Sequence, residues 1–261
     1  MPEQSICKFS PFRTEWLVRG RNFGDGVVEV TAVRSDRYIG AQGMMLRPKA
    51  KRGESENTDD NLMDAAKRAK QQVRLRCKAI GADRMITLTY RENMQDKATL
   101  KRHFNALRRR LGKLQLFHYV AVAERQKRGA WHLHIAVKGR QNYRVLRAIW
   151  RSIVGQDNGN VDVRNPYREK GLRHKLAAYL SKYITKDFGE HQLNEKRYWT
   201  SKGVEIPEQH SIAHITSNDP GKALLQAFDA ALDAGASLDR CQTYWNQELG
   251  CFWLATREHA V

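Results

Sequence analysis

The stretch Gly129-Ala130-Trp131-His132-Leu133-His134-Ile135-Ala136-Val137 sets two histidines in an otherwise apolar segment. Its composition predicts a β-strand over residues 131–137. Because side chains two positions apart lie on the same face of a strand, His132 and His134 are expected side by side. Two neighbouring imidazoles suggest a metal site; the alternative is an ordinary polar face of a strand.

Glu124 strengthens the metal interpretation. It stands at the end of the preceding predicted strand, 117–123, and the intervening segment 125–129 is short enough for a hairpin loop. Such a hairpin would bring Glu124 alongside the histidines. Two imidazoles and one carboxylate with open positions suit a divalent ion, Mn²⁺ or Mg²⁺, better than a closed zinc site. That ion could polarise a phosphate without generating a hydroxide.

The order of elements around this hairpin predicts the fold class. Strands are expected at 85–90, 117–123, 131–137 and 160–163, with helices at 99–111, 143–154 and 173–186. The first six of these elements form the split βαβ, ferredoxin-like or RRM-like pattern of an α+β protein. We expect a central antiparallel sheet backed by helices on one face, with the other face free.

The flanks are expected to be extensions of this core. On the N-terminal side the sequence suggests a strand pair at 27–33 and 37–39, a flexible connection over 47–60, and a helix over 61–80 opened by Thr58-Asp59-Asp60 as capping residues. Residues 189–219 look loop-rich, 221–234 helical, and 241–255 like a hairpin. The expected division is therefore 1–80, 81–190 for the core, and 191–261.

Charge identifies the class of partner. The chain has 46 Lys and Arg against 28 Asp and Glu, a net charge of +18. Such an excess destabilises a compact chain by self-repulsion unless a polyanion binds, so nucleic acid is the expected partner. Charge alone does not separate DNA from RNA. The sequence contains no GxxxxGK phosphate loop, which argues against an ATP-driven helicase module.

The remaining composition predicts a cytoplasmic protein. No apolar run approaches the roughly 18 residues of a membrane span, and the N-terminus lacks a signal-peptide pattern. The cysteines Cys7, Cys77, Cys241 and Cys251 have no CxxC spacing, which argues against a zinc ribbon and a disulfide framework.

A second constellation of residues lies on the predicted helix 173–186. Tyr179 and Tyr183 are four residues apart, as are Lys182 and Lys186, so each pair shares one side of the helix. The ordinary interpretation is an amphipathic helix with packed tyrosines and solvated lysines. In a basic protein with a metal site, however, a tyrosine hydroxyl activated by nearby Lys⁺ could attack a phosphodiester.

Residues expected to contact nucleic acid fall in three places. Thr87 and Thr89 share one face of the first core strand, and Arg197, Tyr198 and Trp199 could grip and stack single-stranded bases or simply form a buried aromatic pair. The helix 99–111 and its ends carry seven cations and no carboxylate, a pattern that favours phosphate contacts. These cations are Lys97, Lys101, Arg102, Arg108, Arg109, Arg110 and Lys113.

In their order and spacing, these motifs resemble those of HUH endonucleases, the rolling-circle replication initiators of phages, plasmids and small single-stranded DNA viruses. The motifs are the strand 85–90, Glu124 eight residues before His132-Leu133-His134, and Tyr179-Leu180-Ser181-Lys182-Tyr183. Leu133 takes the place of the bulky apolar residue of the name. The paired tyrosines are most similar to the two-tyrosine initiators of single-stranded DNA phages. The resemblance covers roughly residues 83–188.

The resemblance implies a nicking and joining reaction on single-stranded origin DNA, with Mn²⁺ or Mg²⁺ bound by the residues of the hairpin. One of Tyr179 and Tyr183 would form a 5′-phosphotyrosine and release a 3′-hydroxyl that primes replication; the other would later close the circle. Which tyrosine acts first stays open, as does the choice between Lys182 and Lys186 at the scissile phosphate. A host helicase and polymerase are further expected partners, in a bacterial cytoplasm if the protein comes from a phage or plasmid.

Two rival hypotheses remain. One is a single-tyrosine transposase of the same fold. The other is a non-catalytic RRM-like nucleic-acid-binding protein, although such a platform needs stacking aromatic residues on its central strands, and the strands 85–90 and 131–137 are poor in them. A relaxase fits less well, because that class places its tyrosine before the histidine motif.

Overall fold

The chain forms two compact units, which are named here unit 1 and unit 2. The computed structural model describes residues 12–24, 26–39, 57–165, 173–186, 196–237, 239 and 241–256. Unit 1 combines residues from 1–54 with residues from 207–261, and unit 2 comprises 55–206. Unit 2 is therefore inserted, in the sequence, between the two parts of unit 1. The sequence suggested instead three consecutive segments with limits at residues 80 and 190.

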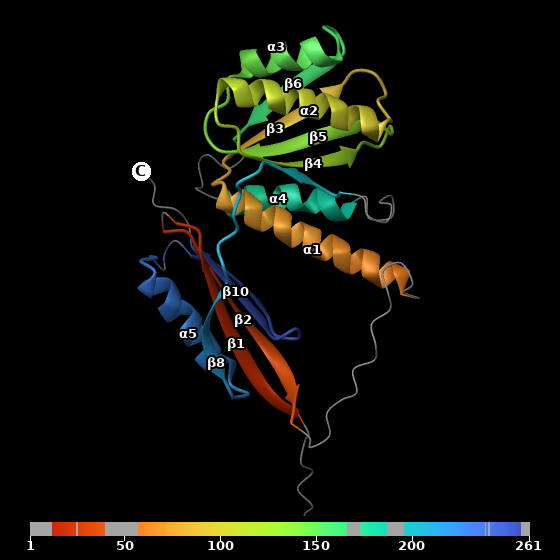
Figure 1. The fold of residues 1–261 in the computed structure, drawn as a ribbon. Helices are drawn as coiled ribbons and strands as arrows, with labels where there is room; N and C mark the ends of the chain where they lie inside the picture. Colours follow the sequence, from red (N-terminus) through yellow and green to blue (C-terminus); the bar gives the residue numbers. More distant parts are fainter. Residues whose placement is uncertain are drawn as a thin grey trace, which may run out of the picture. The chain divides into compact units, whose positions relative to one another are not determined.

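Unit 2 has the expected ferredoxin-like core (Figure 1). Its elements are α1 (Thr58–Ala79), β3 (Arg84–Tyr90), α2 (Lys97–Leu114), β4 (Tyr119–Arg125), β5 (Trp131–Val137), α3 (Tyr143–Val154), β6 (Gly159–Arg164), α4 (Arg173–Lys186) and β7 (Trp199–Thr200). The strand order β6-β3-β5-β4-β7 is antiparallel throughout. The first strand of the split βαβ pattern, β3, thus lies between the third and fourth, β5 and β6. The predicted α+β fold class is confirmed.

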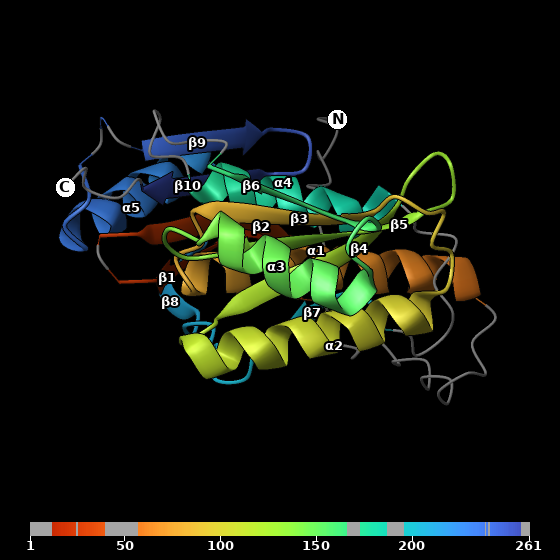
Figure 2. The same ribbon diagram turned by 90° about the horizontal axis from the view of Figure 1, so that it is seen from above.

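Two helices, α2 and α3, cover one face of this sheet and lie side by side in Figure 2. Their apolar stripes, which include Leu107 and Trp150, pack on strand residues such as Leu88 and Leu133, all buried. Each helix begins at a side chain that accepts hydrogen bonds from backbone N–H groups of the first turn, Asp96 for α2 and Asn142 for α3. We call this side of the sheet the α2 face.

The opposite face is also covered, so the expectation that it is free was wrong. Helices α1 and α4 pack against each other and on β4 (Figure 1). Val73 and Cys77 of α1 meet Leu180 of α4 in a second core with Val122. We call this side the tyrosine face, after the residues of α4. The predicted helix 61–80 begins three residues earlier, at Thr58, and Asn57 precedes it without a side-chain capping bond.

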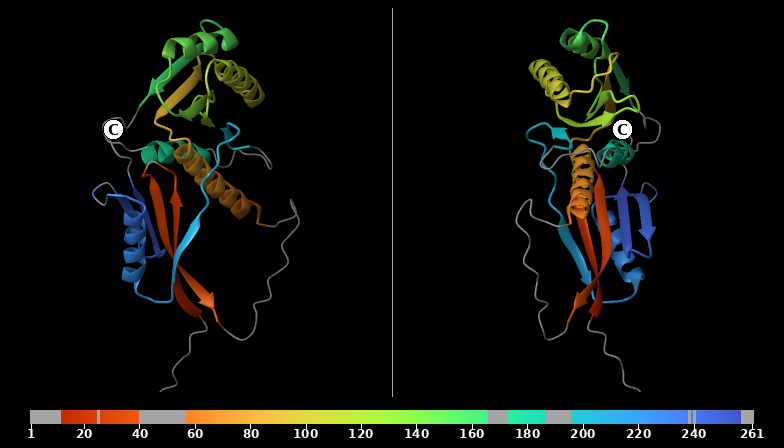
Figure 3. Two further views of the ribbon diagram at one scale, coloured as in Figure 1. Left: turned by 60° about the vertical axis from the view of Figure 1, so that its left-hand side comes forward. Right: turned by 90° about the vertical axis from the view of Figure 1, so that its right-hand side faces the viewer.

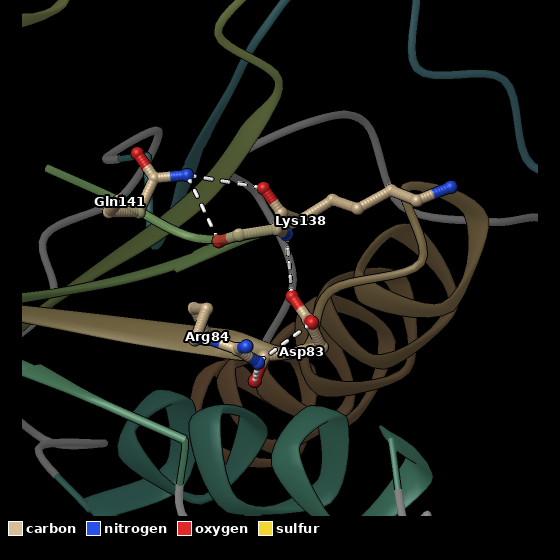
Figure 4. Close-up of polar contacts among 5 residues, drawn as sticks. Asp83, Arg84, Lys138 and Gln141 are labelled. Carbon is tan, nitrogen blue, oxygen red and sulfur yellow. Dashed lines mark hydrogen bonds and ion pairs between the residues drawn. The ribbon is translucent and has the colours of Figure 1, made fainter. Parts of the chain in front are cut away.

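A polar clasp ties the loop between β5 and α3 to the start of β3 (Figure 4). Asp83 accepts a hydrogen bond of 2.6 Å from the Gly139 N–H through one carboxylate oxygen and pairs with Arg84 at 2.8 Å through the other. The Gln141 side chain donates to the carbonyls of Lys138 and Gly139. The clasp fixes the connection that follows the histidine strand.

Unit 1 is a five-stranded antiparallel sheet with one helix on it (Figure 3). Its elements are β1 (Phe12–Asn22), β2 (Val28–Tyr38), β8 (His210–Ile215), α5 (Pro220–Asp233), β9 (Cys241–Asn246) and β10 (Cys251–Thr256). The strand order is β8-β1-β2-β10-β9, so the N-terminal pair β1–β2 lies between strands from the C-terminal part of the chain. Ala223, Ala227 and Ala231 of α5 pack on the buried Val18 and Val30.

Several sequence predictions for the flanks need correction. The strand pair at 27–33 and 37–39 is a single strand, β2, and its partner is β1, which was not predicted. The loop-rich segment 189–219 contains β7 and β8. The helix at 221–234 and the hairpin at 241–255 are confirmed as α5 and the β9–β10 pair. Of the expected flexible connection 47–60, residues 47–56 lie outside the described part.

The net positive charge belongs entirely to unit 2. Residues 55–206 contain 33 Lys and Arg against 15 Asp and Glu, which gives +18, whereas the rest of the chain has 13 of each. The electrostatic attraction for a polyanion is therefore a property of the ferredoxin-like unit. In the described part of the chain, no helix is long and apolar enough to span a bilayer.

Candidate active site

The β4–β5 hairpin brings Glu124 to the histidine strand. Gly129, with φ of +89°, adopts a left-handed conformation in the turn that glycine tolerates without steric cost. The hydrogen bond from the Gln126 N–H to the Ala130 carbonyl closes the hairpin at 2.9 Å. In the resulting register, Glu124 lies directly opposite His132. The sequence expectation that a short hairpin sets these residues side by side matches this geometry.

His134 is held from both sides on the tyrosine face. Its Nε2 lies 2.8 Å from Glu124 Oε2, and both side chains are almost fully buried, with exposures of 6% and 8%. Its Nδ1 lies 3.3 Å from the hydroxyl of Thr87, which is paired with it across β3 and β5. Thr87 was expected to touch nucleic acid; in the structure its hydroxyl contacts the imidazole, and the residue also lines a hollow on this face.

His132 is a neutral imidazole at neutral pH. Burial lowers its pKa to about 4, and the charge of neighbouring His134 acts in the same direction, while Glu124 opposes both. Burial disfavours the charged form of an imidazole because the surrounding protein solvates it less well than water. A neutral ring nitrogen is the form that binds a metal.

The two tyrosines of α4 meet at this site. The ring of Tyr183 stacks on the ring of His134, with centroids 4.2 Å apart and planes 6° from parallel. The Tyr183 hydroxyl donates a hydrogen bond of 2.6 Å to the Tyr179 hydroxyl, and the two rings are perpendicular. Their separation of one helical turn allows this contact. The structure thus joins the histidine motif and the tyrosine motif.

The two candidate lysines are less well defined. Lys182 is exposed on α4, one residue before Tyr183. Lys186 is the last residue of the helix, and its side chain lies outside the described part of the structure. The structure therefore leaves the choice between them where the sequence left it.

The donor set suits a divalent metal by its chemistry, with two imidazoles and one carboxylate on one face of the sheet. Among the described residues, however, no group of three His, Cys, Asp or Glu side chains is arranged to hold a metal ion. Glu124 and His134 bind each other here by a hydrogen bond. A hollow lined by Thr89, Glu124, Lys127, Arg128 and His132 lies at the open end of this group.

The predicted nucleic-acid residues divide into two groups. Lys101 and Arg108 of α2 line one pocket together with Arg197, Tyr198 and Trp199. Arg102 and Arg109 instead line a second hollow, together with Asn105 and Arg108, and Arg110 donates to Ser152 Oγ. Thr89 lies on the tyrosine face, in the lining of two hollows.

Sequence reasoning missed two sets of basic residues. Lys127 and Arg128 were read only as a hairpin loop, although they line the hollow beside His132. Lys196 and Lys202 flank the aromatic pair and line the pocket under α2. Their density of charge next to predicted functional residues was a usable signal in both cases.

The fold and this site together define an α+β unit in which paired histidines and a carboxylate face a two-tyrosine helix. Residues 83–188 match the family model of replication-associated protein ORF2/G2P. The matched range runs from the start of β3 to just beyond α4, so it contains the candidate metal ligands and both tyrosines but not residues 197–199. The match supports a role as a replication initiator. Searches of curated proteins and of solved structures gave no match.

Proposed function

We propose that this protein is a replication initiation endonuclease that nicks and rejoins single-stranded origin DNA through a 5′-phosphotyrosine intermediate. The observation that carries the proposal is the convergence of motifs distant in sequence: Tyr183 stacks on His134, which in turn bonds Glu124. The match to a replication-associated family and the +18 charge of unit 2 support it independently.

In the proposed reaction, one tyrosine oxygen attacks the scissile phosphorus. A bond forms between phosphorus and the tyrosine oxygen, and the bond from phosphorus to the 3′ oxygen breaks. The phenolic proton leaves the nucleophile and the 3′ oxygen gains a proton, so a 3′-hydroxyl is released as a primer. The hydrogen bond between the hydroxyls of Tyr179 and Tyr183 keeps both oxygens on the same face of the sheet, and the phenolic proton passes to solvent.

Glu124, His132 and His134 are the residues that would hold a divalent ion, Mn²⁺ or Mg²⁺. When bound, the ion supplies charge stabilisation at the phosphate. The neutral state of His132 and the carboxylate of Glu124 are consistent with this role. The Thr87 hydroxyl orients the imidazole of His134.

Two tyrosines within hydrogen-bond distance favour a mechanism that uses both. After one round of synthesis, the second hydroxyl cuts the regenerated origin, and the released 3′-hydroxyl attacks the first phosphotyrosine to close the circle. A single-tyrosine transposase of the same fold is the second candidate, since either hydroxyl alone reaches the same face.

The test is covalent trapping. The full chain is incubated with random-sequence single-stranded oligonucleotides and Mn²⁺, and adducts are resolved on a denaturing gel. We expect each single variant, Tyr179→Phe and Tyr183→Phe, to form a DNA-linked protein but to lose joining. The double variant should form no adduct. Tyr143→Phe, an exposed tyrosine on α3, is the matched control and should behave as wild type.

Other outcomes select the rivals. If one single variant abolishes adducts while the other retains joining, the single-tyrosine mechanism holds. If no adduct forms with any metal or sequence, but tight salt-sensitive binding persists, the protein is a binding module and the proposal is wrong.

A further inference from the structure

Within unit 2, a pocket lies between helix α2 and residues 196–202, which include β7. It is separate from the tyrosines, because α2 covers the opposite face of the sheet. Its lining comprises Lys101, Phe104, Asn105, Arg108, Tyr119, Lys196, Arg197, Tyr198, Trp199, Thr200 and Lys202. These residues are contributed by helix α2, the start of strand β4 and residues 196–202, so the fold brings together three separate parts of the sequence.

The lining is strongly basic. Five of these residues are lysine or arginine, and no carboxylate lines the pocket among the described residues. Lys101 and Arg108 stand two turns apart on α2, with both side chains exposed. Cations gathered around a concave site attract an anion, because each contributes to a positive potential there. A phosphate is such an anion.

The base of the pocket is aromatic. Trp199 is half-buried, with its ring 5.9 Å from that of Phe104, which in turn meets Tyr119 edge-on at 5.1 Å. The Trp199 indole N–H has no hydrogen-bond partner among the described residues. An aromatic surface beside clustered cations is the combination that binds a nucleotide, with the base stacked and the phosphate paired.

The segment 198–199 links this pocket to the tyrosines. Tyr198 packs against the core that includes Tyr179 and Tyr183, whereas Trp199, the next residue, packs against the core under α2. Because β7 is the edge strand of the sheet, next to β4, these two neighbouring side chains lie on opposite faces at the edge of the sheet. A DNA strand leaving the tyrosine face can follow the same edge.

We propose that this pocket binds one nucleotide of the substrate strand on the far side of the sheet from the cleavage site, with its base on Trp199 and its phosphate between Lys101 and Arg108. The inference rests on the proposed function and deepens it: the strand turns around the β7 edge. Such an anchor fixes the position of the scissile phosphate, because a strand held on both faces cannot slide.

The first test is a comparison of charge pairs on one helix. Lys101→Ala/Arg108→Ala removes two cations of the pocket, and Arg102→Ala/Arg109→Ala removes two at the same spacing outside it. Both are made in the Tyr179→Phe/Tyr183→Phe background without metal, so that binding is measured free of any cleavage. We expect the pocket pair to weaken binding of a single-stranded oligonucleotide about tenfold more than the control pair. Equal effects would overturn the proposal.

The second test reports on the base. Trp199→Phe keeps an aromatic ring for stacking and packing but removes the fluorophore. Titration with oligonucleotide should quench the tryptophan emission of the wild type clearly more than that of Trp199→Phe, while both bind with similar affinity. Identical quenching in the two proteins excludes stacking on Trp199.

A third test distinguishes a nucleotide within a DNA strand from a free nucleotide as the ligand of the pocket. A free deoxynucleoside monophosphate should quench only at concentrations far above those of the oligonucleotide if the pocket serves a strand. Comparable affinity for both would identify a free-nucleotide site instead and contradict the strand assignment. Adduct formation by the otherwise wild-type protein is scored separately, so the failure of this pocket is distinguishable from the failure of the nicking reaction.

Discussion

At the residue scale, the site depends on how firmly one imidazole is held. His134 bonds Glu124 through one nitrogen and Thr87 through the other, and its ring carries Tyr183. Both ring nitrogens are therefore engaged, and rotation of the ring would break one of these bonds and the stacking together. The tyrosine hydroxyls are positioned by the same side chain that is proposed to bind the metal.

Thr87→Val should lower the affinity for the metal without removing a proposed ligand. The change keeps the shape of the side chain but removes the hydroxyl that orients His134, and loss of such a partner lowers metal affinity about 10- to 100-fold. The Mn²⁺ concentration for half-maximal adduct yield should rise accordingly. Thr89→Val, two residues along the same strand face, is the matched control. An equal response of both variants would rule out the orienting role.

The short-range parts of the site could be predicted from sequence. Spacings of two residues on a strand and four on a helix set side chains on one face whatever the rest of the fold does, so His132 with His134, and Tyr179 with Tyr183, followed directly. The contact of Thr87 with His134 depends on the register between β3 and β5. The register between strands that are not consecutive in the sequence is not encoded in local spacing, so this contact was not predicted.

At the element scale, the order of strands and helices in the core could be predicted from the sequence. The packing of helices over the second face of the sheet could not. Each strand and helix from β3 to β6 has its own apolar period, and short connections leave few alternative topologies. The packing of α1 with α4 over the second face joins helices that are far apart in the chain. The apolar stripe of α1 predicts a helix but does not indicate which surface of the protein that helix covers.

The Asp83 clasp is a discrete contributor to the stability of the histidine strand. Asp83→Ala removes the acceptor of the Gly139 N–H and the partner of Arg84. Because hydrogen bonds to a charged group contribute about 1.5 kcal/mol or more, amide exchange in residues 138–141 should accelerate by about tenfold. Hydrogen exchange followed by mass spectrometry measures this directly.

The control for Asp83→Ala is the substitution of another aspartate that pairs with a nearby arginine. Asp162 pairs with Arg164 at 2.6 Å, but both side chains are exposed, at 41% and 70%. Exposed ion pairs contribute little, so Asp162→Ala should leave exchange near residues 138–141 unchanged. Asp83→Asn, which keeps one oxygen acceptor, should fall between the two. A clasp without structural importance would show no difference among the three.

At the scale of the whole molecule, the net charge differs between the two units. Since the entire +18 resides in unit 2, the salt dependence of DNA binding should respond to substitutions there alone. Lys101→Ala/Arg108→Ala should reduce the slope of log affinity against log salt by about 0.7, because the pair is proposed to contact one phosphate and each phosphate contact on a single strand contributes about 0.7.

Unit 1 supplies the comparison for this slope. Arg19 and Arg37 are exposed arginines of β1 and β2. Arg19→Ala/Arg37→Ala removes the same charge as the pair on α2 and should leave the slope unchanged. Fluorescence anisotropy with a labelled oligonucleotide at several salt concentrations measures both. A matching decrease in the unit 1 variant would mean that DNA contacts extend beyond the ferredoxin-like unit.

The split sheet of unit 1 also sets an order of events during synthesis. The hairpin β1–β2 leaves the ribosome first, but its neighbours β8 and β10 are encoded more than 170 residues later. At elongation rates of about 5–20 residues per second the wait is on the order of ten seconds, during which the contiguous unit 2 can already fold. For that interval, Val18 and Val30 have no helix to cover them. A nascent chain stalled once residue 206 has left the ribosome should therefore expose this hairpin to chaperones while unit 2 is complete.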